Sequence, residues 1–440
     1  MKKINYLFAT IAAVGLVACS SEEVASVQDL QRGLQTSEGI AFSPLSKNST
    51  RSTVINSTSD MTSFKVRGTW FASQASGSKI YINGQEVTLG SAISANAEYV
   101  GQVQEVTPAT DPATYQFAAD KGFGAGIEIV NNSGAWNYKN ASETQYWPFV
   151  AQTSGTTTTG YTCLPLNFNA VTPASAGINL VTKQFAYTNT TAPTVADMVD
   201  ICYADTTNMT NAQAPVLLTF KHLFSQIIVK AKKASDYTVD IQSVQINGMK
   251  YNGNADMTNK PLTWNATGSA TSYYAYGSAS ATTAYSIPAS AADEAPVKMT
   301  PAGQELLLIP QTIAKWVPET DGAITTPASQ AKGWIAIKYR AKKSDAASWA
   351  TGDATSDGYT TTYFPLQATW KAGKIYAYTL LFGGVADPED PGTTDPENPD
   401  PGNDNPGGFD DTGKPEAPSV AITFTAKVDD WTSDNVDITF

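Results

Sequence analysis

Residues 420–429 of this 440-residue chain have the sequence Val-Ala-Ile-Thr-Phe-Thr-Ala-Lys-Val-Asp. One face of this stretch would carry Val420, Ile422, Phe424, Ala426 and Val428, and the other small, polar or charged residues. Side chains of a β-strand point alternately to opposite faces, so the pattern predicts a strand with one apolar side. Such a strand cannot bury that side alone and needs a groove or a sheet to lie against.

A matching pattern occurs near the start of the chain. Ile40-Ala41-Phe42-Ser43 places an isoleucine and a phenylalanine on one side of a predicted strand, as Ile422-Thr423-Phe424-Thr425 does. Between the tail (419–440) and the preceding strands lies a linker, 385–418, rich in Pro, Asp, Glu, Gly and Asn. Fully extended, it could reach roughly 100 Å. A chain with a mobile strand at one end and a similar strand at the other has the parts for strand exchange between identical subunits.

The acidic linker could also suggest calcium sites. It lacks the Asp-x-Asp-x-Asp-Gly loop with a closing glutamate, so we expect a solvated spacer instead. The chain as a whole has 28 basic and 40 acidic residues and a formal net charge of −12. Such a balance makes it a poor partner for nucleic acid or anionic lipid.

The first residues predict export. Lys2 and Lys3 precede an apolar run, and Leu16-Val17-Ala18-Cys19 is followed by two serines and two glutamates. This predicts a lipoprotein signal peptide over 1–18, with Cys19 lipidated and held at the outer membrane; the alternative is an ordinary signal with an incidental cysteine. Cys163 and Cys202 would then remain, either as small buried residues or as one disulfide, and spacing does not decide between them.

The remaining sequence predicts an all-β protein with two β-sandwich domains, 52–210 and 211–384. Strand-like runs alternate with Gly, Asn and Ser, and Asn83-Gly84 between two such runs predicts a hairpin. In the second domain Leu218, Phe220, His222 and Phe224 share one face; the phase then slips near Ser225-Gln226, which predicts a β-bulge. The weakly periodic segment 266–290 is expected to be a surface loop.

Residue types that carry chemistry are scarce. His222 is the only histidine and lies on an apolar face, so we expect a core histidine with no catalytic or metal-binding role. The chain has no Gly-x-Ser-x-Gly, Cys-x-x-Cys or His-Glu-x-x-His motif, and we expect no enzyme activity, metal or cofactor. A carboxylate pair could still meet in three dimensions. Trp147, Trp264, Trp334 and Trp370 are expected in packing, with sugar stacking as the rival interpretation.

Several short stretches in this order resemble the fimbrillin (Mfa-like) family of Bacteroidetes surface pili, a type V pilus. They are the lipobox ending at Cys19, Ser-Thr-Arg-Ser around Arg51, Tyr146-Trp147-Pro148, 166–170, Phe220-Lys221-His222-Leu223, 306–311, 373–376, and Val428-Asp429-Asp430-Trp431. The resemblance implies two transthyretin-like sandwiches and export as a lipoprotein. It also implies cleavage by an Arg-specific protease, which removes the first strand so that another subunit's strand fills the groove.

On this sequence the resemblance implies a propeptide, 19–51, that contains the removable strand of Ile40 and Phe42. Arg51, followed by Ser52, is the expected cut, because it follows that strand in a Ser/Thr-rich stretch. Arg32 is the alternative, and Arg67 should be protected within the next strand. The expected donor residues are Val420, Ile422, Phe424, Ala426 and Val428.

The sequence thus predicts a structural pilin of a surface fimbria, used in adhesion. Its expected partners are copies of itself, other pilus subunits, the protease and host or bacterial surface ligands. The alternative is an uncut surface lipoprotein of the same fold that serves as pilus anchor or tip, or binds glycans. Since some relatives have no such long linker, the tail could instead fold back on its own domain.

Overall fold

The computed structural model describes residues 39–45, 61–106, 113–288, 296–300, 305–321, 323–324, 332–351, 357–383 and 422–430. Within these ranges the molecule consists almost entirely of β-strands, and the all-β prediction is confirmed. The α-helix described there, α2 (Pro318–Asp321), has four residues. The short 3₁₀ helices are η1 (Ala141–Glu143), η2 (Val195–Asp197) and η3 (Asn211–Gln213). In these ranges no helix has both the length and the apolar character needed to cross a membrane.

Two six-stranded sheets and one strand pair contribute to a first hydrophobic core, which we call the N-terminal core. Phe64, Ile82, Phe168 and Leu218 are among its members. The first sheet has the order β10 (Thr157–Cys163), β9 (Pro148–Ser154), β3 (Lys79–Ile82), β4 (Gln85–Thr88), β6 (Tyr115–Phe117), β5 (Val103–Glu105). The second has the order β15 (Lys221–His222), β13 (Cys202–Met209), β11 (Leu166–Thr172), β2 (Ser63–Trp70), β7 (Ile127–Asn132), β8 (Ala135–Tyr138). The pair is β1 (Phe42–Leu45) with β14 (Val216–Thr219).

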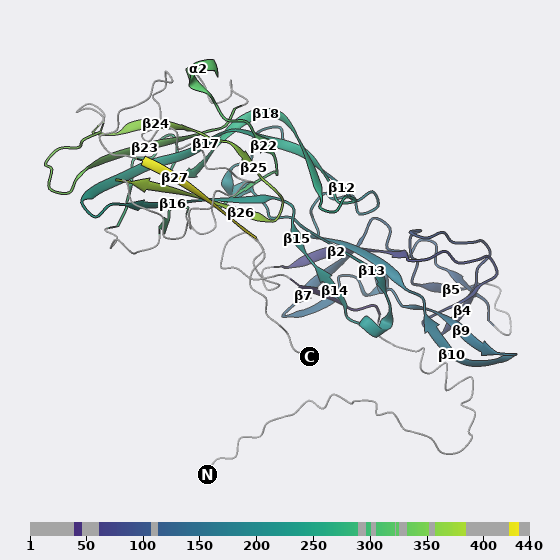
Figure 1. Cartoon of the computed structure of the whole chain (residues 1–440). Helices are drawn as coiled ribbons and strands as arrows, with labels where there is room; N and C mark the ends of the chain where they lie inside the picture. Colours follow the sequence, from purple (N-terminus) through teal and green to yellow (C-terminus); the bar gives the residue numbers. More distant parts are fainter. Residues whose placement is uncertain are drawn as a thin grey trace, which may run out of the picture.

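A second group of sheets encloses a larger core, the C-terminal core, with Ile227, Ile246, Trp370 and Tyr378 among its members. One sheet contains β12 (Gln184–Tyr187), β17 (Tyr237–Asp256), β23 (Trp334–Lys343), β24 (Thr360–Pro365), β18 (Thr263–Tyr276) and β19 (Tyr285–Ser286). Another contains β20 (Val297–Lys298), β16 (Ser225–Lys233), β26 (Lys374–Phe382), β27 (Ile422–Asp430) and β21 (Leu306–Leu308). The last is β22 (Thr312–Ile313) with β25 (Ala368–Thr369). Figure 1 shows the two groups as separate bodies of strands.

Local turn chemistry follows the sequence. Asn83 and Gly84 have φ angles of 48° and 77° and join β3 to β4, which confirms the predicted hairpin. Both residues adopt the left-handed conformation that a two-residue turn between twisted strands requires. Asparagine and glycine tolerate that conformation better than other residues.

The phase slip near Ser225 has a different origin from the one predicted. Leu218, Phe220, His222 and Phe224 are all buried, as the alternation indicates. The bulge, however, is wrong: the strand ends at His222, and the chain then leaves the β13 sheet and enters β16 of another sheet. The residues that point inward change phase here because β16 pairs with other strands and packs against the C-terminal core.

The surface loop predicted over 266–290 is also wrong for much of its length. β18 runs to Tyr276 and pairs antiparallel with β17, and Tyr273 and Ala275 are buried. The other side of β18 is largely polar and partly exposed, and its register against β17 shifts at three places. These irregularities break the alternation that would reveal a strand, so backbone pairing with β17 decides its structure.

The chain passes between the two cores more than once. β12 falls in the range predicted for the first sandwich, yet it pairs with β17 of the second group. The domain boundaries stay a prediction. Trp147, Trp334 and Trp370 are buried, and Trp264 packs against the C-terminal core, which confirms the packing role expected for them.

Candidate functional site: the seat of the first strand

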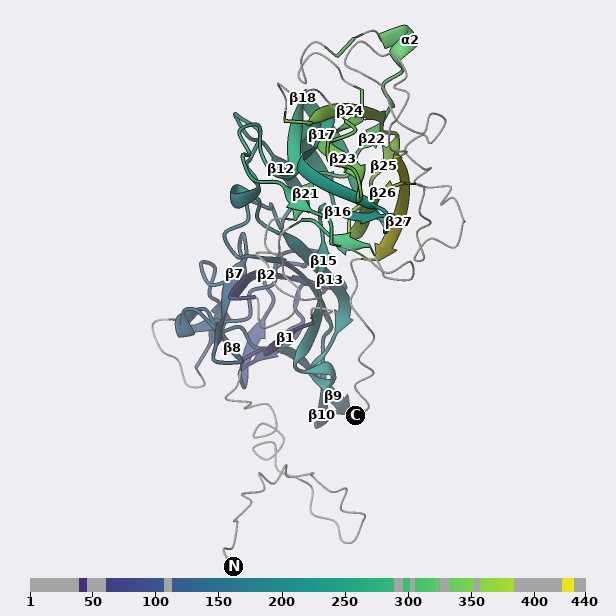
Figure 2. The ribbon, with the colours of Figure 1, turned by 90° about the vertical axis from the view of Figure 1, so that its left-hand side faces the viewer.

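The segment of the first strand, residues 40–45, has buried apolar side chains. Ile40 and Phe42 have exposed fractions of 0% and 4%, while Ala41 between them is exposed. The strand therefore turns an apolar face inward, with the period of two expected for extended chain. Figure 2 shows β1 in the lower group of strands.

Backbone hydrogen bonds hold the strand on both sides. β1 pairs parallel with β14, with Phe42 beside Val216. The Val216 amide donates to the Ala41 carbonyl at 2.9 Å, and the Ile40 amide donates to the Gln145 carbonyl at 2.7 Å. β1 thus bridges two segments that lie far apart in sequence. Any strand that replaced it would have the same main-chain donors and acceptors available.

The Phe42 side chain packs among three aromatic rings. Its centroid lies 5.4 Å from that of Phe168 and 6.3 Å from those of Phe64 and Tyr138, each in an edge-on arrangement. The Tyr138 hydroxyl donates to the Ile40 carbonyl at 2.9 Å. Burial raises the pKa of Tyr138 well above its ordinary value, so this hydroxyl stays protonated and remains a donor.

We call this surface the β1 seat: Phe64, Tyr138, Phe168, Val216 and Leu218, with the Gln145 carbonyl. Burying an Ile or Phe side chain contributes about 1.5–3 kcal/mol each, so the strand stabilises the core by several kcal/mol. Removal of β1 would expose these apolar residues and leave the β14 edge unpaired. Chemically, the seat can bind an extended strand that carries apolar residues at alternate positions.

The tail strand is already paired within its own chain. β27 lies antiparallel beside β26, from Phe382 opposite Ile422 to Lys374 opposite Asp430 (Figures 1 and 2). The four expected donor residues within β27 lie opposite four members of the C-terminal core: Ile422, Phe424, Ala426 and Val428 pair with Phe382, Leu380, Tyr378 and Tyr376. The structure thus contains the folded-back arrangement that the long linker suggested as an alternative.

Several predicted positions lie outside the described residues, namely Cys19, Arg32, Arg51, Ser52, Val420 and the whole linker, 385–418. Arg67 lies in β2 with 8% exposure, and its Nε donates to the Gly124 carbonyl at 3.2 Å. A protease needs its site in an extended, accessible segment, so this burial agrees with the protection expected for Arg67.

The two later cysteines are free thiols, so the disulfide left open by the sequence is not formed. Cys202 is buried at 1% exposure, whereas Cys163 is partly exposed. His222 is buried at 8%, as predicted, but its ring contacts Asp200 and Cys202 instead of a purely apolar surround. Sequence reasoning missed this cluster. The available signal was the Asp-x-Cys spacing, which puts two side chains on the same side of an extended chain.

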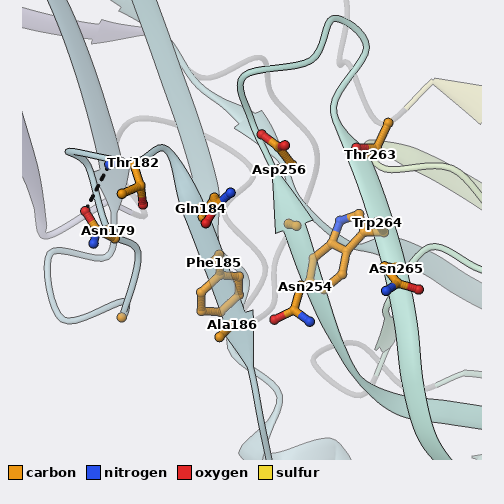
Figure 3. A pocket seen from close by; sticks show the side chains of 12 residues that line it. Asn179, Thr182, Gln184, Phe185, Ala186, Asn254, Asp256, Thr263, Trp264 and Asn265 are labelled. Atoms are coloured by element: carbon orange, nitrogen blue, oxygen red, sulfur yellow. Dashed lines mark hydrogen bonds between the residues drawn. The ribbon is translucent and has the colours of Figure 1, made fainter.

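A pocket of about 460 Å³ lies beside β12, β17 and β18 (Figure 3). Its lining includes the polar side chains of Gln184, Asn254, Asp256 and Asn265 around Trp264. The Trp264 indole donates to the Leu223 carbonyl at 2.8 Å, so the ring is fixed to the core. This polar and aromatic lining is the nearest counterpart, among the described residues, of the sugar-binding surface considered from the sequence.

Comparisons with known proteins identify the family of the chain. Among solved structures, the chain is similar to a fimbrial protein from Bacteroides vulgatus, with 13% identity, a TM-score of 0.43, and coverage of 84% of this chain and 93% of that one. It is also similar to the tip fimbrial protein Mfa3 from Porphyromonas gingivalis with C-terminal truncation, with 9% identity, a TM-score of 0.29, and coverage of 88% and 99%. No curated protein matches. The model of fimbrillin-like proteins matches residues 102–396, well over half of the sequence. The chain belongs to the fimbrillin-like family.

Proposed function

We propose that this protein is a structural pilin that is exported as a lipoprotein and assembles into surface fimbriae for adhesion. Lipid on Cys19 holds the precursor at the outer membrane. An Arg-specific protease cuts after Arg51, so the mature chain starts at Ser52 and loses β1. The emptied β1 seat then receives the tail strand of another subunit. Family membership supports the pilus role.

The observation that carries the strand-exchange proposal is the match between β1 and the tail. Ile40 and Phe42 are buried side chains of the first strand, and Ile422 and Phe424 have the same spacing in the tail. A tail strand that enters the seat parallel to β14 would present Ile and Phe to the same aromatic pocket. Each subunit would thus supply in trans what proteolysis removes in cis.

In the free subunit the tail strand is held on β26, where it covers the edge of its own sheet. This pairing occupies one side of the tail strand before assembly. Exchange replaces the β26 pairing by pairing in the seat of a neighbour. The linker, 385–418, supplies the length for that transfer.

The test is the N-terminus and intact mass of the protein taken from the cell surface. A start at Ser52 without lipid is the expected result. A chain that retains acylated Cys19 throughout the population would contradict the proposal, because β1 would still fill the seat. A start at Gly33 would move the cut to Arg32 and leave β1 in place, which would also contradict it.

A second candidate is an uncut anchor or tip subunit of the same family. The pairing of β27 with β26 favours it, since a tail that stays on its own sheet donates nothing. In that case the polar pocket beside Trp264 is the surface to screen against glycans and other surface ligands. Mass analysis of assembled fimbriae distinguishes the two candidate functions. If the protein is the structural pilin, its copies in the fimbria are cut. If it is an anchor, it is found uncut and lipidated.

A further inference from the structure

Three side chains of metal-ligand type converge beside the N-terminal core. The His222 Nδ1 atom lies 2.9 Å from Asp200 Oδ2, 3.1 Å from Asp200 Oδ1 and 3.3 Å from Cys202 Sγ. The Cys202 Sγ atom lies 3.9 Å from Asp200 Oδ1. Asp200 and Cys202 are each 1% exposed and His222 is 8% exposed. The proposed assembly role does not require such a group, and none of its three residues belongs to the β1 seat.

The geometry differs from that of a catalytic relay. In a nucleophile–His–carboxylate relay the nucleophile and the carboxylate contact different ring nitrogens, because the proton passes through the imidazole. Here the thiol and the carboxylate both face Nδ1 of His222. Convergence of three donor atoms on one point is instead the arrangement that a metal ion requires.

The distances have the scale of a zinc site. A triangle with sides of 3.1, 3.3 and 3.9 Å has a point equidistant from its three corners. That point lies about 2.0 Å from each atom, against typical zinc bonds of about 2.0–2.2 Å to nitrogen or oxygen and about 2.3 Å to sulfur. A small shift of the ion toward His222 and Asp200, together with a shift out of the plane, satisfies all three bonds.

We propose that Asp200, Cys202 and His222 bind one divalent zinc-class ion. A thiolate and an imidazole favour zinc over calcium or magnesium, which prefer oxygen ligands. The charges also balance, because a carboxylate, a thiolate and a neutral imidazole cancel the two positive charges of the ion. A neutral site can be buried at much lower cost than separate charges. On binding, the ion displaces the thiol proton to solvent.

The ion would lie where the chain passes between the two cores. Cys202 and His222 are paired residues of β13 and β15, and Cys202 belongs to the N-terminal core. Their neighbours Ile201 and Leu223 belong to the C-terminal core, and the Leu223 amide donates to the Ile201 carbonyl at 2.9 Å. The chain therefore passes between the cores twice at this point. An ion bound by both β13 and β15 would cross-link the two chain segments that run between the cores. The ion would thus stabilise a shaft subunit mechanically.

The experiment uses the untagged full-length protein, reduced and stripped of metal with a chelator. Zinc titrated by calorimetry is expected to bind at one equivalent per chain. Cobalt(II) is expected to give the absorption band of a cobalt–thiolate bond. Because His222 is the only histidine, ¹⁵N NMR of labelled imidazole reports one residue. Its Nδ1 signal should shift on zinc addition, and in the zinc-bound ring the proton should be on Nε2.

Variant proteins complete the test. C202S should lose the cobalt–thiolate band and the stoichiometric zinc, whereas C163S, the matched control at the other free thiol, should keep both. If C202S fails to fold, the ¹⁵N signals of His222 in the unaltered chain still show whether zinc binds there. Either unchanged imidazole signals with excess zinc, or zinc binding by folded C202S equal to that of C163S, would overturn the proposal and leave a hydrogen-bonded polar cluster.

Discussion

The ring of Phe42 meets the ring of Phe168 edge-on, with the two centroids 5.4 Å apart. The first residue belongs to a four-residue strand near the start of the chain, and the second to the middle of the β11 strand. This contact joins a strand that the proposed function removes to the sheet that would receive its replacement. The consequences can be tested on the free subunit and on assembled fimbriae.

Phe42→Ala is expected to destabilise the uncut subunit by about 3–5 kcal/mol, because it deletes a buried aromatic ring and leaves a cavity. Chemical denaturation followed by tryptophan fluorescence measures the change. Phe71→Ala is the matched control, since Phe71 is 41% exposed and its truncation should cost less than about 0.5 kcal/mol. Equal effects of the two substitutions would show that β1 contributes little to the core.

Deletion of residues 419–440 is expected to abolish fimbriae and leave a folded monomer. Within the described part of the chain β27 lies at the sheet edge and pairs only with β26, so its loss should not unfold the cores. Electron microscopy of cells and circular dichroism of the purified deletion variant measure the two effects. Normal fimbriae from the deletion variant would rule out the tail as donor.

Arg51→Ala is expected to leave the precursor lipidated at the membrane and to remove it from fimbriae, because β1 would continue to fill its seat. Immunoblots of membrane and sheared-fimbria fractions measure the distribution. Arg32→Ala is the control and should assemble normally. If only the Arg32 substitution blocked assembly, the functional cut would follow Arg32 and not Arg51.

The Cys163 thiol should react slowly at neutral pH. Burial raises its pKa to about 11, so it is protonated at pH 7 and its thiolate fraction rises about tenfold per pH unit up to that value. In a C19S variant, the rate of reaction with a disulfide reagent should therefore climb steadily from pH 7 to pH 10. A plateau near pH 8.5, as for an ordinary cysteine, would show that the thiol is solvated.

Local sequence is sufficient for much of this fold. Alternation placed Leu218 and Phe220 on the buried face, and Asn83-Gly84 gave the β3–β4 turn, because both depend on neighbours a few residues apart. The β18 strand and the change of sheet after His222 escaped prediction. In each case the deciding interaction is pairing with a strand distant in sequence, which periodicity does not record.

For the candidate sites, the sequence by itself determined the matching apolar faces of β1 and β27, since side-chain order along an extended chain is a local property. Tertiary structure alone decided where those faces lie: Phe42 among three aromatic rings, and the tail strand against β26. It also brought His222 beside Asp200 and Cys202, twenty or more residues away. A contact between distant residues requires loop closure and strand pairing by the whole fold, and no short stretch of sequence specifies either.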